Sequence, residues 1–190
     1  MVHAKKGDLE TAEKIFQKIV TEINTGYAPA YYERAICLHA LGKLNEATDC
    51  YSSFLDEFQD FYKRSGVDFQ EVDSEIIYCD CVCKRGICYF KLDMDDLAHV
   101  DFQAITSLNA HLADIAHHYI GKIYLKRGKF WECIEENERA LKINHKLVDA
   151  YLDRSLAYKN LGKHEEYMQE ITKHQFFKRE LMFHQPVSTL

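Results

Sequence analysis

A short phrase recurs along this chain at a nearly constant spacing. A basic residue or leucine is followed by glycine, a charged residue and, in most copies, an apolar residue. The copies are Lys6-Gly7-Asp8-Leu9, Leu41-Gly42-Lys43-Leu44, Arg127-Gly128-Lys129-Phe130, Leu161-Gly162-Lys163-His164 and a degraded Lys91-Leu92-Asp93-Met94. The intervals between the glycines, or the aspartate in their place, are 35, 51, 35 and 34 residues. A period of this length predicts a repeat protein, and the one long interval predicts an insertion between the second and third copies.

The residues between these phrases have the pattern of helices. Apolar residues recur at three- and four-residue intervals nearly everywhere, and the chain has only 2 prolines and 8 glycines. Strand signals are absent from the sequence. We therefore predict an all-α fold.

Small and large residues alternate at fixed places relative to each turn. Seven residues before the turn stand Ala35, Gly86, Gly121 and Ser155, and three residues later Leu38, Tyr89, Tyr124 and Tyr158. After the turn a small residue follows at Ala12, Ala47, Ala98 and Cys133, and then an aromatic residue at Phe16, Tyr51 and Phe102. Tyr167, Asn137 and Ile171 depart from this scheme. Alternating small and bulky side chains let antiparallel helices approach closely and interdigitate.

This multi-position pattern resembles the tetratricopeptide repeat (TPR), a helix-turn-helix unit of about 34 residues. The resemblance implies a TPR-like α-solenoid of antiparallel helix pairs with about four and a half repeats. The chain lacks the family's closing proline, and Tyr31, Val82, His117 and Tyr151 stand where the family has tryptophan or a substitute.

The expected array covers residues 1–183. Its copies are expected at about 1–25, 28–60, 79–112, 114–146 and 148–183, with the insertion at about 61–77 and a flexible tail at 184–190. The first copy lacks most of its opening helix, so its second helix has an uncovered face. Either the chain belongs to a longer array, or a neighbour covers Ile15, Phe16, Ile19 and Ile23, since solenoids need polar caps at their ends.

Composition narrows the partners and the compartment. The net charge of −6 argues against nucleic acid as a partner. No apolar run approaches the length needed to cross a bilayer, and the charged N-terminus is unlike a signal peptide, so no membrane insertion is expected. Seven cysteines, an odd number scattered through helices, favour a reducing compartment. We expect a cytoplasmic protein.

No catalytic or metal-binding constellation stands out. In the run Cys79-Asp80-Cys81-Val82-Cys83, helical geometry turns Cys81 away from the other two thiols, and the side chains of His117 and His118 diverge, which argues against a metal. The alternative of metal or thiol chemistry predicts stoichiometric zinc in the purified protein. A phosphate-binding glycine loop, a Gly-x-Ser-x-Gly elbow and a His-Glu-x-x-His pattern are all missing. We therefore expect neither an enzyme nor a cofactor.

The resemblance implies that the opening helix of each pair lines a concave groove. Phasing then predicts the partner-binding residues Tyr32, Ile36, His39, Cys83, Lys84, Ile87, Phe90, His118, Tyr119, Lys122, Leu152 and Leu156. Apolar and aromatic residues with few charges suit a peptide or helix of a partner protein, so we predict an interaction module or scaffold. Two alternatives stay open: a structural component packed into a large assembly, and a co-chaperone-type adaptor. The latter would lack the usual carboxylate clamp, because Tyr32, Ile36, Ile115 and Tyr119 occupy clamp positions in one register and Asp149 and Asp153 in the other.

Overall fold

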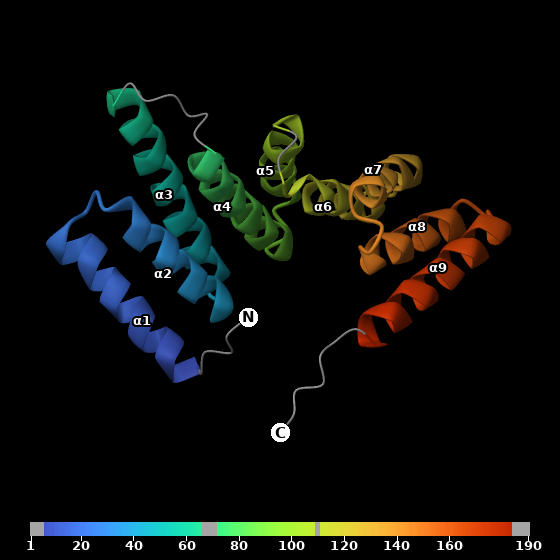
Figure 1. The fold of residues 1–190 in the computed structure, drawn as a ribbon, viewed down its shortest axis with the longest axis horizontal. Helices are drawn as coiled ribbons and strands as arrows, with labels where there is room; N and C mark the ends of the chain where they lie inside the picture. The colour runs from blue at the N-terminus through green and yellow to red at the C-terminus, as the bar shows by residue number, and fades with distance from the viewer. Residues whose placement is uncertain (1–5, 66–71, 109–110, 184–190) are drawn as a thin grey trace. The chain divides into compact units, whose positions relative to one another are not determined.

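The computed structural model describes residues 6–65, 72–108 and 111–183, in which helices are joined by short turns and no strand occurs (Figure 1). The α-helices are α1 (Lys6–Lys18), α2 (Ala28–Ala40), α3 (Leu44–Ser65), α4 (Val72–Lys91), α5 (Asp95–Ser107), α6 (Ala113–Lys126), α7 (Phe130–Ile143), α8 (Val148–Asn160) and α9 (His164–Phe183). A π-helical turn, Ile19–Ile23, extends α1. The predicted all-α fold is confirmed. The helices form two compact units, Met1–Ile105 and Thr106–Leu190.

In the first unit, consecutive helices pack against one another. α1 packs on α2, α2 on α3 and α3 on α4, and in Figure 1 α2 and α3 run antiparallel side by side. A partly buried ion pair ties α1 to α2, with Arg34 Nε donating to Glu13 Oε1 at 2.9 Å. Ile15 and Ile23, on the face that the sequence leaves uncovered, are 56% and 69% exposed, whereas Phe16 and Ile19 are partly buried.

The second unit repeats the same arrangement. α6 packs on α7, α7 on α8 and α8 on α9, and α6 also contacts α8. Its core includes Cys133, Ile134 and Ala157 between α7 and α8, and Leu141, Ala150 and Tyr151 nearer the other end of these helices. Tyr151 Oη donates to the carbonyl of His145 at 3.1 Å, and in the first unit Tyr31 makes the equivalent bond to the carbonyl of Thr25 at 2.9 Å. Both tyrosines occupy positions where the sequence departs from the family's tryptophan.

Four described turns that carry the recurring phrase share one backbone geometry. Gly42, Gly128 and Gly162 have φ of 77°, 70° and 73°, and Asp93, in the degraded copy, has φ of 58°. In each turn the residue after this one donates its amide proton back to a carbonyl near the helix end, for example Lys43 N to Leu38 O at 2.9 Å and Met94 N to Tyr89 O at 2.9 Å. This is the Schellman arrangement, in which a left-handed residue closes a helix. In four of its five copies the recurring phrase therefore encodes the same turn, whereas Gly7 of the first copy lies within α1.

Replacing Gly128 by alanine should cost about 1 kcal/mol, because an L side chain is strained in the left-handed region. A Cβ there would meet nothing within 4 Å, so the loss comes from the backbone alone. Gly128→Asn should cost less, because asparagine tolerates this conformation. Urea unfolding followed by the fluorescence of Trp131, the only tryptophan, measures both variants. Equal losses for alanine and asparagine would contradict this explanation.

Two of the predicted small residues are required by close helix contacts. A Cβ on Gly86 would lie 3.0 Å from the ring of Phe102, and a Cβ on Gly121 would lie 2.4 Å from Nδ2 of Asn137. Phe102 and Asn137 are both completely buried. Asn137 thus occupies in its copy the place that an aromatic ring occupies in the preceding copy.

The long interval in the repeat corresponds to two long helices. α3 has 22 residues and α4 has 20, whereas α2 has 13. Of the predicted insertion at 61–77, residues 66–71 lie outside the described part, as does the predicted tail at 184–190. The added length of α3 extends beyond Ala28, where its antiparallel partner α2 begins.

Candidate functional site

Three residues of α2 and α4 form a polar cluster on the face that the sequence assigns to a partner. Tyr32 Oη donates to the carboxylate of Asp80, and Lys84 Nζ also donates to Asp80. Lys84 Nζ lies 3.3 Å from Tyr32 Oη. Burial, reinforced by the hydrogen bond to Asp80, raises the pKa of the Tyr32 phenol well above its usual range. Tyr32 therefore remains a protonated donor, and the cluster holds α2 and α4 in register.

A second polar contact joins the same two helices near the other end of α2. Lys91 Nζ donates to Nε2 of His39 at 3.1 Å. Burial, and next the positive charge of Lys91, lower the pKa of His39 below its ordinary value. His39 is thus a neutral acceptor at physiological pH. Of the predicted binding residues, Tyr32 and Lys84 lie together in the structure. His39 lies beside Lys91, a residue that the sequence analysis did not predict to bind a partner.

Apolar side chains lie on α2 and α4 between these two contacts. Ile36, Ile87 and Phe90 are partly buried, so part of each side chain remains accessible. Cys83 is only 3% exposed. It contributes to the core and offers almost no surface to a partner.

In the second unit, too, some of the predicted binding residues are partly accessible and one is buried. His118 is 5% exposed, with Nδ1 2.9 Å from Asn137 Oδ1 and 3.5 Å from Asp153 Oδ2. Lys122 Nζ lies 3.9 Å from the same Asp153 oxygen. Burial raises the pKa of Asp153, opposed by the charges of Lys122 and His118. His118 therefore serves an internal network, whereas Tyr119, Lys122 and Leu152 are partly accessible and Leu156 is 38% exposed.

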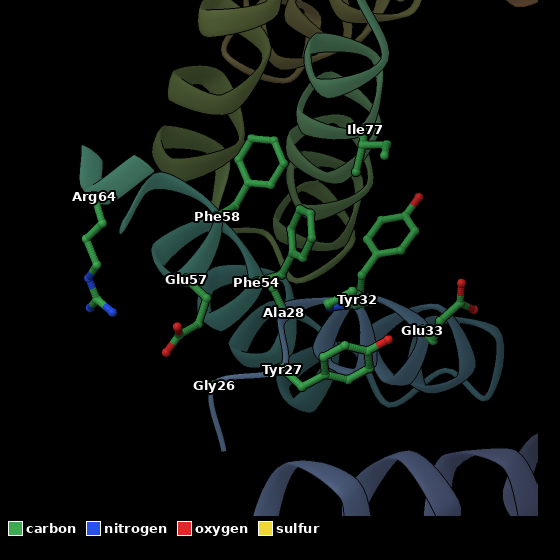
Figure 2. A pocket seen from close by; sticks show the side chains of 11 residues that line it. Gly26, Tyr27, Ala28, Tyr32, Glu33, Phe54, Glu57, Phe58, Arg64 and Ile77 are labelled. Atoms are coloured by element: carbon green, nitrogen blue, oxygen red, sulfur yellow. The ribbon is translucent and has the colours of Figure 1, made fainter. Parts of the chain in front are cut away.

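The first unit also contains a cavity of about 880 Å³ that sequence reasoning missed. Figure 2 shows side chains from α2, α3 and α4 around it, with Tyr32, Phe54, Phe58 and Ile77 forming its apolar part. Tyr27, Glu33, Glu57 and Arg64 contribute polar groups. Only Tyr32 belongs to both the cavity and the predicted binding residues. The 51-residue interval was the one sequence feature that pointed to this region, because the cavity lies beside the added turns of α3.

All seven cysteines are buried thiols. Burial raises the pKa of Cys88 to about 11 and that of Cys133 to about 12, and it raises the pKa of Cys81 further. These thiols are therefore protonated at neutral pH and are weak nucleophiles and weak metal ligands. Across residues 6–65, 72–108 and 111–183, no group of three or more His, Cys, Asp or Glu is arranged to hold a metal ion. None of the helices in these ranges combines the length and apolar character needed to span a membrane.

Solved structures place this fold among helical repeat proteins. The chain superposes on a crystal structure of MamA with a TM-score of 0.76 and 18% identity, covering 94% of each chain. It also matches MamA from Desulfovibrio magneticus RS-1 with a TM-score of 0.73 and 14% identity, over 92% of this chain and 88% of that one. YrrB, described as a TPR protein with an unusual peptide-binding site, matches with a TM-score of 0.68 and 19% identity, over 93% of this chain and 81% of that one. The chain therefore has the tetratricopeptide-repeat fold.

The likeness to these proteins is seen in the structure and not in sequence comparisons. No family model matches the chain. No curated protein matches it either. The fold is carried instead by the shared turns and by the small and large residues that pack between them.

Proposed function

We propose that the protein is a protein-protein interaction module that binds a peptide or helical segment of a partner. Each unit contributes its own binding residues on the first helix of each pair, and we call these residues the helix-opening face. They are Tyr32, Ile36, His39, Lys84, Ile87 and Phe90 in the first unit and Tyr119, Lys122, Leu152 and Leu156 in the second. The observation that carries the proposal is the partly accessible apolar stretch of Ile36, Ile87 and Phe90 between two fixed polar contacts.

A surface of this kind suits recognition of an apolar segment. Interfaces derive most of their energy from a few apolar or aromatic anchors surrounded by polar groups that exclude water. The hydrogen bonds of Tyr32 and His39 fix the surrounding polar groups in advance, so less conformational freedom is lost when a partner binds. The TPR fold of the chain and the peptide-binding site named for YrrB support the same interpretation. We propose no catalytic role.

An acidic chaperone tail fits this surface less well. Lys84 is paired with Asp80, and Lys122 lies near Asp153. A ligand carboxylate would therefore have to compete with a carboxylate already beside each lysine. The alternative of a structural component is favoured by one observation, the exposure of Ile15 and Ile23 on α1. A neighbour that covers this face remains a prediction.

Substituting the helix-opening face should release the partner without unfolding the protein. We expect that the tagged wild type recovers a stable partner in immunoprecipitation followed by mass spectrometry, and that Ile87→Asp with Tyr119→Ala reduces this recovery at least about tenfold, because the apolar anchors are lost. Ile143→Asp, at a 54% exposed position on α7, is the matched control and should bind like the wild type. Unchanged recovery by the double variant would remove this face from consideration.

A further inference from the structure

The cavity of the first unit exists because the long helices extend past the start of α2. α2 begins at Ala28, whereas α3 continues to Ser65 and α4 begins at Val72, so the last turns of α3 and the first turns of α4 lie beside the N-terminal end of α2. The lining residues come from these segments, including Phe58 and Arg64 of α3 and Ile77 of α4 (Figure 2). The cavity therefore depends on the extra residues in the second interval, which is 51 residues long.

A row of aromatic rings forms one wall of the cavity. The ring centroids of Tyr32 and Phe54 are 5.3 Å apart, and those of Phe54 and Phe58 are 5.4 Å apart. Outside the lining, the ring centroid of Tyr78 lies 6.2 Å from that of Phe58. Phe54 is only 4% exposed, so the row is anchored in the core. The volume of the cavity, about 880 Å³, lies in the range of ligand-binding pockets. A wall of this kind selects an apolar or aromatic occupant.

Two further apolar groups of the cavity face solvent. Tyr27 is 48% exposed and Ile77 is 44% exposed. Both line the same cavity as the buried rings, although Tyr27 precedes α2 and Ile77 belongs to α4. An occupant would therefore contact rigid aromatic groups inside and accessible apolar groups at the opening.

The charges at the opening are mainly negative. Glu33 and Glu57 both line the cavity, and in the view of Figure 2 they lie on either side of Tyr27. In the described part of the chain, neither carboxylate has an ion-pair partner, whereas the one cationic lining residue, Arg64, donates to Asp60 at 3.3 Å. Glu57 Oε2 lies 3.6 Å from the position of a Cβ on Gly26, so it stands directly over the loop that enters α2. Two unpaired carboxylates beside an exposed tyrosine ring attract a cation.

We propose that this cavity binds a segment of a partner protein that carries a large apolar or aromatic side chain with Lys or Arg about one helical turn away. The apolar side chain lies against Phe54 and Phe58, and the basic side chain reaches Glu33 or Glu57 across the face of Tyr27. This inference rests on the proposed function, because it assumes a protein partner, but it assigns a different site and a definite ligand chemistry. The net charge of −6 favours the approach of such a basic segment.

The probe is a phage-displayed library of random peptides of about 12 residues, which is long enough for a helix or strand that spans the cavity. Selection on the full chain should enrich peptides that combine an aromatic or aliphatic anchor with Lys or Arg. The enriched peptide is then synthesised with a fluorescent label, and its binding is measured by anisotropy. We expect Ile77→Asp, and separately Glu33→Lys with Glu57→Lys, to weaken binding at least about tenfold. Raising the salt from about 0.05 M to about 0.5 M should also weaken it, because exposed charges are screened.

Matched variants distinguish the cavity from the rest of the surface. Ile143→Asp, and Glu132→Lys with Glu135→Lys, make the same kinds of change at exposed residues of α7 and should leave binding unchanged. Unaltered far-UV circular dichroism of all variants shows that the fold is kept. Enrichment of acidic peptides, of purely apolar peptides or of none at all overturns the proposal.

One comparison separates this inference from the proposed function. If Ile87→Asp abolishes binding of the enriched peptide and Ile77→Asp does not, the helix-opening face is the binding site and the cavity assignment is wrong. If the reverse holds, the cavity assignment stands and the helix-opening face loses its role for this ligand. If neither variant affects binding, both assignments fail.

Discussion

Replacing Gly121 by alanine should destabilise the second unit by about 3 kcal/mol, since overpacking a core and breaking buried hydrogen bonds each cost 1–3 kcal/mol. The new methyl group would lie 2.4 Å from Nδ2 and 3.0 Å from Cγ of Asn137. Asn137 cannot move away easily, because it is fully buried and its Nδ2 donates to the carbonyl of Cys133 at 2.9 Å while its Oδ1 contacts His118. The higher helix propensity of alanine offsets only about 1 kcal/mol of this loss.

Trp131 lies in the second unit, so its fluorescence during urea unfolding measures this loss. Lys159→Ala, at an exposed position of α8, is the control and should change the free energy of unfolding by less than about 0.5 kcal/mol. The clash should also be relieved by a second substitution. Asn137→Ala alone is destabilising, but Gly121→Ala with Asn137→Ala should lose at least about 1 kcal/mol less than the sum of the single losses. Additive losses would show that the two residues do not contact each other.

The helical repeat could be predicted from the sequence because the residues that form the turns and the residues that pack between the helices recur with the same period. The recurring glycine marks a left-handed turn residue, and even Asp93, in the degraded copy, adopts the same conformation. The small residues at Gly86 and Gly121 mark contacts that any larger side chain would obstruct. Each of these features depends on the residue at a single position, which a sequence displays directly.

The candidate sites were less predictable, because they depend on which side chains meet across helices. Phasing placed His118 on the helix-opening face, but the replacement of an aromatic ring by Asn137 left a polar partner that draws the imidazole into the core. The cavity was missed for a related reason. Its walls come from α2, α3 and α4, and its size depends on how far two helices extend beyond a third, which no short motif records.

Removing the guanidinium of Arg85 should destabilise the first unit by about 3 kcal/mol at neutral pH, because it leaves a buried carboxylate without its partner. Arg85 holds three helices together: Nε and Nη2 donate to Asp101 at 2.9 and 2.7 Å, and Nη1 donates to Ser52 at 3.1 Å. The side chain of Asp101 is only 5% exposed. Arg85→Met keeps much of the apolar stem, so the measured loss reports mainly on the charge and its hydrogen bonds.

The loss should depend on pH. Burial raises the pKa of Asp101 although Arg85 lowers it, so removing Arg85 raises this pKa further. A carboxyl whose pKa is higher in the folded than in the unfolded protein favours folding when protonated, and this contribution is lost as the pH rises from the unfolded to the folded pKa. The difference between wild type and Arg85→Met should therefore be larger at about pH 7.5 than at about pH 5, as measured by urea unfolding with far-UV circular dichroism.

Two further variants test this explanation. Arg85→Met with Asp101→Asn has no buried charge, so it should regain part of the stability at about pH 7.5 and lose the extra dependence on pH. Arg154 and Glu170 form the equivalent pair in the last copy with the same separation of 16 residues, at 3.5 Å, but Glu170 also accepts from Lys173 at 2.8 Å. Arg154→Met therefore leaves its carboxylate paired and should cost less than Arg85→Met. Equal costs at both positions, or a loss at Arg85 that does not change with pH, would show that packing rather than charge determines the effect.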